Sequence, residues 1–140
     1  MAESITYLAA PKGRFVEEQA EHVIKRDLAA ADAAAGVLSL KNATGRDLFV
    51  TRLVLRITTK ATAACTVDAG VAATEVSDDT LIDGLDVGTA ATDADNVQNS
   101  GTNGKKVGKL WKNGEFLTAS KATGATAGMV GQALVCVAPV

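Results

Sequence analysis

The stretch "LFVTRLVLRITT", residues 48–59, decides the fold class of this chain. Its side chains alternate with a period of two, the period of a β-strand whose successive residues point to opposite faces of a sheet. One set is predicted to face the core: Phe49, Thr51, Leu53, Leu55 and Ile57. The other set carries two arginines and is predicted to face solvent or an interface: Val50, Arg52, Val54 and Arg56. An antiparallel sheet with one buried face has this pattern.

The alternation continues toward the C-terminus. In "CTVDAGVA", residues 65–72, it places on one side of the strand Cys65, Val67, Ala69 and Val71. In "MVGQALVCVAPV", residues 129–140, one side carries Met129, Gly131, Ala133, Val135 and Val137, and the other Val130, Gln132, Leu134, Cys136 and Ala138. Between these segments, Asn113 and Gly114 separate "KKVGKLW" from "FLTAS". Because Asn-Gly adopts the tight turns of two-residue hairpins, we expect these two segments to pair with each other. Short strands between Gly-rich turns predict a mainly β fold, an antiparallel β-sandwich or barrel.

The N-terminal segment allows two interpretations. Apolar residues spaced three and four apart in residues 13–36 are compatible with a helix that ends at Gly36. The same residues can form an extended arm, a strand near residues 21–28 and an alanine-rich loop. Helix propensity favours the first interpretation and the β-rich remainder favours the second, which we adopt. We therefore expect an N-terminal arm over residues 1–20 and one β domain over residues 21–140.

The middle of the chain is predicted to be an irregular connection. Residues 74–105 are rich in Asp, Asn, Gly, Ser and Thr, which favour turns. Within them, "DDTLIDGLDVG" places four aspartates around a glycine, but neither the ligand spacing nor the closing glutamate of an EF-hand is present. We expect Asp78 or Asp79 to cap a turn and the neighbouring apolar side chains to pack beneath the loop: Leu81, Ile82 and Leu85. No metal site is predicted.

Composition excludes several classes of function. Hydrophobic residues make up 47% of the 140 residues but aromatic residues only 4%, which predicts a thin core that partner subunits could complete. A net charge of −2 argues against a nucleic-acid surface and against a polybasic membrane anchor. No segment approaches the roughly 18 continuous apolar residues of a membrane span. We also find no pattern typical of a secretory signal at the N-terminus.

No catalytic constellation emerges from the sequence. His22 is the only histidine, and no nucleophile stands beside it in a known motif. Cys65 and Cys136 are too few for a structural zinc site, and we expect two buried free thiols, with a bridge between them as the alternative. The prediction is a protein that is not an enzyme and has no cofactor. Basic residues instead gather around the last strands: Lys105, Lys106, Lys109, Lys112 and Lys121.

Several segments carry a likeness to a known family: "LKNATGRDLFVTRLVLRITT", "CTVDAGVA", "DTLIDG", "GEFLTAS" and "GMVGQALV". From residue 38 to the C-terminus, the chain resembles small virion proteins of tailed bacteriophages. The resemblance implies a jelly-roll-like β-sandwich that serves as a head decoration (cement) protein or a related auxiliary capsid protein. Such a protein is made in the host cytoplasm and ends on the capsid surface of the virion.

The resemblance also implies partners. These are the major capsid protein and further copies of the chain in a homotrimer, with neither nucleic acid nor membrane. The residues expected to contact the capsid or a neighbouring subunit are Tyr7, Arg14 and Phe15 of the arm, and Arg52 and Arg56 of the central strand. The arginines are chosen because guanidinium groups suit ion pairs at interfaces.

A different class of function stays open. Jelly rolls also serve as lectins, so the chain could be a carbohydrate- or cell-surface-binding module of a head fibre or tail. Sugar sites favour exposed aromatic side chains, and only Tyr7 and Trp111 are candidates. Trp111 could stack on a sugar, although a single tryptophan in this context more often covers a small core. A hydrolase on a β-sandwich would need an acid–base pair that the sequence does not offer.

Overall fold

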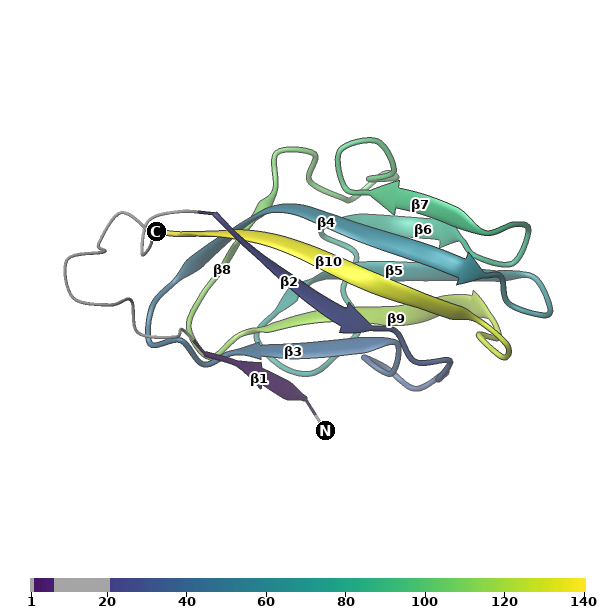
Figure 1. The fold of residues 1–140 in the computed structure, drawn as a ribbon, viewed down its shortest axis with the longest axis horizontal. Coiled ribbons are helices and arrows are strands. Elements are labelled where there is room, and N and C mark those ends of the chain that lie inside the picture. Colours follow the sequence, from purple (N-terminus) through teal and green to yellow (C-terminus); the bar gives the residue numbers. More distant parts are fainter. Residues whose placement is uncertain (1, 7–20) are drawn as a thin grey trace.

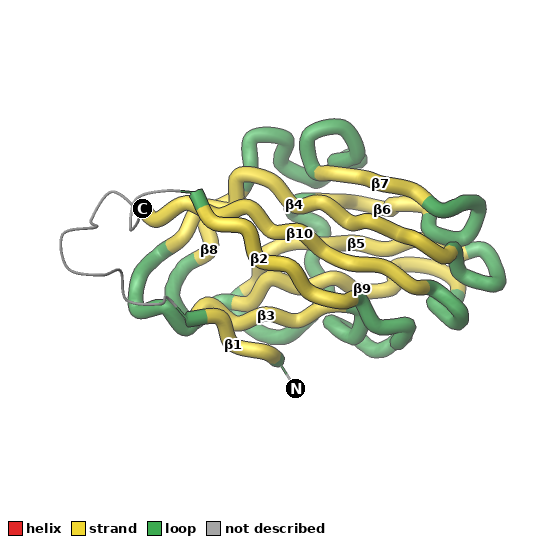
Figure 2. The backbone as a smooth tube through the Cα atoms, viewed as in Figure 1, coloured by secondary structure: helices red, strands yellow, loops and turns green. Residues whose placement is uncertain are grey.

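The computed structural model describes residues 2–6 and 21–140, and every regular element in these residues is a β-strand (Figures 1 and 2). The strands are β1 (Glu3–Ile5), β2 (His22–Asp27), β3 (Leu38–Asn42), β4 (Leu48–Thr59), β5 (Cys65–Ala72), β6 (Ile82–Asp86), β7 (Thr92–Asp95), β8 (Lys109–Trp111), β9 (Phe116–Gly124) and β10 (Val130–Pro139). The mainly β prediction is confirmed. Because β2 occupies the segment that also allowed a helix, the helical interpretation is wrong. No described helix is long and apolar enough to span a bilayer.

The strands form two sheets of five strands (Figure 1). One has the order β1-β3-β9-β5-β6; the other has the order β2-β10-β4-β7, with β8 also paired to β4. All pairs are antiparallel except β1 with β3. Neither sheet closes into a barrel within the described residues. Buried apolar side chains from both sheets form one continuous core.

Strands from the first half of the chain pair with strands from the second half. β2 pairs with β10, β3 with β9, β4 with β7 and β5 with β6. As the first strand of the pair advances from β2 to β5, its partner moves back along the chain from β10 to β6. Two further pairs, β4 with β10 and β5 with β9, join these ladders into the sheets. The longest strand, β4, therefore lies in the middle of its sheet.

The alternation predicted for β4 is correct in its second half and wrong in its first half. Leu53, Leu55 and Ile57 are buried as predicted, whereas upstream it is Leu48 and Val50 that are buried. The register explains the inversion, since Cys136 lies opposite Arg52 but Val137 lies opposite Val50. Thr51 is thus the extra residue of a β-bulge, which shifts the side-chain alternation by one. Phe49 and Thr51 consequently lie half-buried on the other face.

The predicted hairpin around Asn113 and Gly114 is wrong in its pairing. The turn itself forms, with Glu115 N donating to Lys112 O at 3.0 Å and Gly114 at φ 90°. However, β8 pairs with β4, and β9 pairs with β3 and β5 in the other sheet. Trp111 is fully buried at the end of β8. The local sequence predicts that β8 and β9 pair with each other, but β8 instead pairs where Trp111 is buried in the core. The turn therefore connects the sheet of β4 to the sheet of β3 and β5.

The predicted irregular region contains two strands, β6 and β7. β6 pairs with β5 and β7 pairs with β4. Leu81, Ile82 and Leu85 are buried, as predicted. These strands were not predicted because they are short and lie at sheet edges. At an edge, only one face needs apolar side chains, and the longer neighbouring strand supplies the hydrogen bonds.

Part of the segment expected to be an arm lies against the domain. β1 pairs in parallel with β3, and the Arg26 guanidinium on β2 forms an ion pair with Glu3 at 2.8 Å. This ion pair links edge strands of the two sheets. The rest of the expected arm, with Tyr7, Arg14 and Phe15, lies outside the described residues.

Candidate functional site

The aspartates of "DDTLIDGLDVG" hold loops in place. The Asp78 carboxylate accepts a hydrogen bond from Thr80 N at 2.9 Å, which confirms the predicted turn cap. Asp79 accepts from the Asn103 side chain at 2.9 Å, and Asp83 accepts from Asn103 N at 3.1 Å. These bonds tie the loop before β6, and β6 itself, to the loop before β8. The carboxylates are therefore already engaged by donors of the chain.

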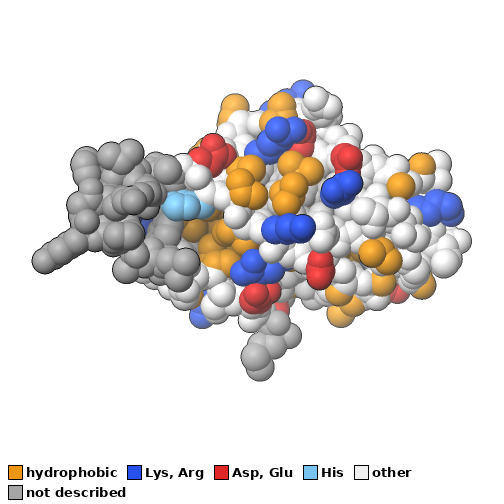
Figure 3. Space-filling view, in the orientation of Figure 1, with side chains coloured by type: hydrophobic (Ala, Val, Ile, Leu, Met, Phe, Trp, Pro, Cys, Tyr) orange, Lys and Arg blue, Asp and Glu red, His pale blue; other side chains and the backbone are white. Residues whose placement is uncertain are grey.

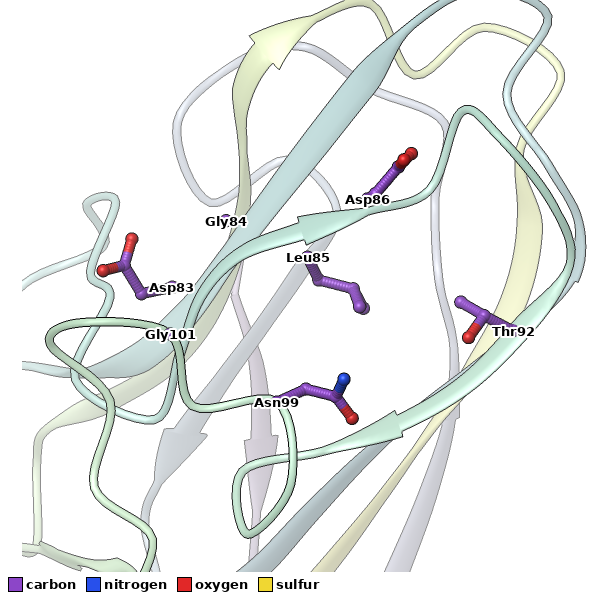
Figure 4. Close-up of a pocket in the computed structure, with 7 residues that line it drawn as sticks. All are labelled: Asp83, Gly84, Leu85, Asp86, Thr92, Asn99 and Gly101. Carbon is purple, nitrogen blue, oxygen red and sulfur yellow. The ribbon is translucent and has the colours of Figure 1, made fainter.

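A shallow depression of about 390 Å³ opens between the edge strands β6 and β7 (Figure 4). Leu85, Thr92 and Asn99 point into it, whereas the carboxylates of Asp83 and Asp86 point away from it and from each other. Hydrogen bonds from the Thr89 side chain and from the backbone N–H groups of Gly88 and Thr89 lower the pKa of Asp86. Since the carboxylates do not converge, they form neither an acid–base pair nor a chelate. Among the described residues no group of three or more His, Cys, Asp or Glu is placed to hold a metal ion.

The cysteines are free, as predicted. Cys65 lies buried on β5, but Cys136 on β10 is only half-buried, on the side of its sheet away from the core. Burial raises the pKa of both thiols, so both are protonated at neutral pH and neither is an activated nucleophile.

Trp111 is a core residue. Its exposed fraction is 0%, and its indole N–H donates to Glu115 O at 2.9 Å. It has no exposed ring face on which a sugar could stack. The interpretation of Trp111 as the cover of a small core is confirmed, and its use as a carbohydrate platform is excluded in this conformation.

The outer face of β2, β10 and β4 is an accessible surface with an apolar centre. Cross-strand register places Leu134 between Lys25 and Val54, and Cys136 between Val23 and Arg52. Val23 is 64% exposed. Figure 3 shows apolar side chains gathered in the middle of this side of the molecule with basic side chains around them. We call this surface the outer face: Val23, Lys25, Arg52, Val54, Arg56, Leu134 and Cys136.

The two arginines predicted as contact residues lie on the outer face, each held by an aspartate of β7. Arg52 Nε lies 2.9 Å from Asp95 Oδ2, and Arg56 Nε lies 3.6 Å from Asp93 Oδ1. Both arginine side chains are more than half exposed. The guanidinium groups are thus oriented before any partner arrives.

Asp95 is the most constrained of these acids. Burial raises its pKa, but hydrogen bonds from Gln98 N, from the Arg52 side chain and from Val97 N outweigh burial, so the pKa of Asp95 lies below its ordinary value of 3.8. A depressed carboxyl pKa contributes stability above the unfolded-state pKa, and this contribution is lost as pH falls through the folded-state value.

We predict from this shift that Asp95→Asn makes the stability less dependent on pH in acid. The wild-type free energy of unfolding should fall as pH drops below about 4, and the variant should lose part of that fall while being less stable at neutral pH. Urea unfolding at several values between about pH 2 and pH 7 measures this. Asp93→Asn is the control, because its exposed ion pair contributes little. Equal acid slopes in wild type and Asp95→Asn would contradict the assignment.

Comparison with family models, curated proteins and solved structures found no match for this chain. Sequence reasoning identified the arginines of the outer face, but it did not identify the apolar residues between them as one surface. The available signal was the alternation within residues 129–140, which places Leu134 and Cys136 on one side of the strand.

Proposed function

We propose that this chain is a non-enzymatic structural protein of a tailed-phage virion, which binds the outside of the capsid as a homotrimer and stabilises the shell. The outer face carries this proposal. An apolar centre surrounded by charged side chains is the composition of a protein–protein interface, with an apolar core and a polar rim. The resemblance of residues 38–140 to small virion proteins names the partner, the major capsid protein.

The proposed fold is a jelly-roll-like β-sandwich. Without β1 and β8, the sheets are β2-β10-β4-β7 and β3-β9-β5-β6, and consecutive strands from β2 to β5 alternate between them. The pairing of β2 with β10, β3 with β9, β4 with β7 and β5 with β6 supports this topology, because it is the pattern of a long antiparallel ribbon rolled into two layers. Jelly rolls of eight strands occur in viral capsid proteins and lectins.

The charge distribution on the outer face supports contact with another protein subunit. Arg52 and Arg56 are matched by Asp95 and Asp93, so Lys25 is the one cation of the outer face without an ion pair among the described residues, and the excess charge is small. A nearly neutral face does not repel a second copy of itself. A homotrimer would also present several equal contacts to the shell, and such multivalent binding is strong even when each contact is weak.

Co-sedimentation with expanded tailed-phage capsid shells stripped of this protein tests the proposal. We expect saturable binding at a fixed ratio to the major capsid protein, and this ratio gives the number of copies per site. Leu134→Asp places a charge at the apolar centre of the outer face and should weaken trimer formation or shell binding. Absence of binding by the wild type would overturn the capsid role.

Trp111 was the main candidate residue for the carbohydrate-binding alternative, and it is buried. The remaining aromatic candidate, Tyr7, lies outside the described residues. A glycan array on which the wild-type protein binds, together with a negative shell assay, would favour this alternative.

A further inference from the structure

The loop before β8 projects an apolar side chain into solvent. Val107 is 81% exposed, the highest value among the large apolar side chains of the described chain. It lies in a tight turn, in which Gly108 N donates to Lys105 O at 3.1 Å. We call residues 105–109, with the sequence "KKVGK", the lysine turn.

The lysine turn is firmly attached to the domain. Lys105 N donates to Thr80 O at 2.8 Å, and the buried Asn96 side chain donates to Lys105 O at 3.0 Å. Gly108 has a φ of +98° and lies so close to β4 that a Cβ atom there would be 2.1 Å from Val50 O. The backbone of the turn is thus ordered before binding, so that docking it costs little conformational entropy.

The charges of the lysine turn are unmatched within the described residues. Lys105 and Lys106 are exposed and Lys109 is half-buried, and none of the three forms an ion pair there. The arginines behave differently: Arg26, Arg52 and Arg56 each have a carboxylate partner. The turn therefore places three unmatched positive charges around the most exposed apolar side chain of the described residues.

We propose that the lysine turn docks onto an acidic protein surface, with Val107 seated in an apolar hollow and the lysines facing carboxylates around it. Resting on the proposed function, this inference assigns the acidic surface to the capsid shell. Unpaired lysines are complementary in charge to carboxylates on a partner surface. The exposed valine favours a partner that offers an apolar contact, and a folded protein surface does so. The outer face is then left for contact between copies of the chain.

A protein partner fits this site better than a nucleic acid does. Both kinds of partner supply negative charge to the lysines, so charge alone does not distinguish them. Val107 does, because it is 81% exposed and a phosphate backbone offers it no apolar contact, whereas a folded protein does. We therefore expect no measurable binding to a short DNA duplex.

The test compares shell binding of two variants with that of matched controls. Lys105→Glu combined with Lys106→Glu reverses the charge of the turn, and Val107→Ser removes its apolar contact. The controls are Lys60→Glu and Val130→Ser, since Lys60 and Val130 are exposed at the other end of β4 and β10. We expect the half-saturation concentration to rise about tenfold or more for each lysine-turn variant and to stay unchanged for the controls.

The outcomes separate this inference from the proposed function. Weakened binding of both lysine-turn variants, together with a smaller salt dependence for the charge reversal, supports the docking role. If both lysine-turn variants bind shells as tightly as the wild type, the docking role is overturned, but the proposed capsid function is not. Failure of the wild type to bind shells overturns both. Binding of the wild type to a DNA duplex, lost in the charge reversal, overturns the assignment to a protein partner. Equal thermal unfolding of all variants shows that they remain folded.

Discussion

Trp111→Ala is expected to lower the free energy of unfolding by about 3–5 kcal/mol, the usual cost of removing a fully buried aromatic side chain from a core. Trp111 has no exposed surface, and its indole N–H is bonded to Glu115 O. The change creates a large cavity and removes one of the two donors to that carbonyl, which keeps the hydrogen bond from Asn42 N at 2.9 Å. Chemical denaturation of wild type and variant measures the difference.

Trp111→Phe separates the two contributions. Phenylalanine fills much of the cavity but cannot donate to Glu115 O, so a smaller loss of about 1–3 kcal/mol is expected. If Trp111→Ala instead left the stability unchanged and abolished binding to a glycan, Trp111 would be a ligand platform, and both its placement in the core and the capsid proposal would be wrong.

Asn96→Ala is expected to cost about 1–3 kcal/mol, because it leaves the N–H group of the buried Leu53 without a partner, while Lys105 O keeps the hydrogen bond from Gly108 N. The Asn96 side chain accepts from Leu53 N at 2.8 Å and donates to Lys105 O at 3.0 Å. It thereby continues the hydrogen bonding of β4 across the gap between β7 and β8, which pair with different parts of that strand. Urea unfolding measures the loss.

The control for this prediction is Asn99→Ala. Asn99 lies exposed three residues further on, and its side chain makes a single long hydrogen bond, with Asp95 N at 3.3 Å. We expect a loss below about 1 kcal/mol for this change. Similar losses at the two positions would show that the Asn96 bridge adds nothing beyond an ordinary loop contact. Because Asn96 also holds Lys105, its replacement should weaken shell binding as well.

Sequence reasoning succeeded where a long strand carries a clear period. Leu53, Leu55 and Ile57 alternate over enough residues to identify a core face, and the alternation in residues 129–140 identifies β10 as a strand. It failed at Thr51, because a bulge depends on the register with the partner strand and leaves no mark in the local pattern. For the candidate surface, the alternation placed Arg52 and Arg56 on one face. Their pairing with β7 could not be foreseen, since β7 itself was not predicted.

By itself, the sequence determined the β class of the chain, the core face of the second half of β4, the turn at Asn113 and a turn cap at Asp78 or Asp79. These features depend on residues close together along the chain, where side-chain period and turn chemistry act directly. The tertiary structure alone decided that β8 pairs with β4 and not with β9, and that Val107 is exposed among unmatched lysines. These outcomes depend on contacts between distant segments, since burial and charge pairing are settled only when both sheets share one core.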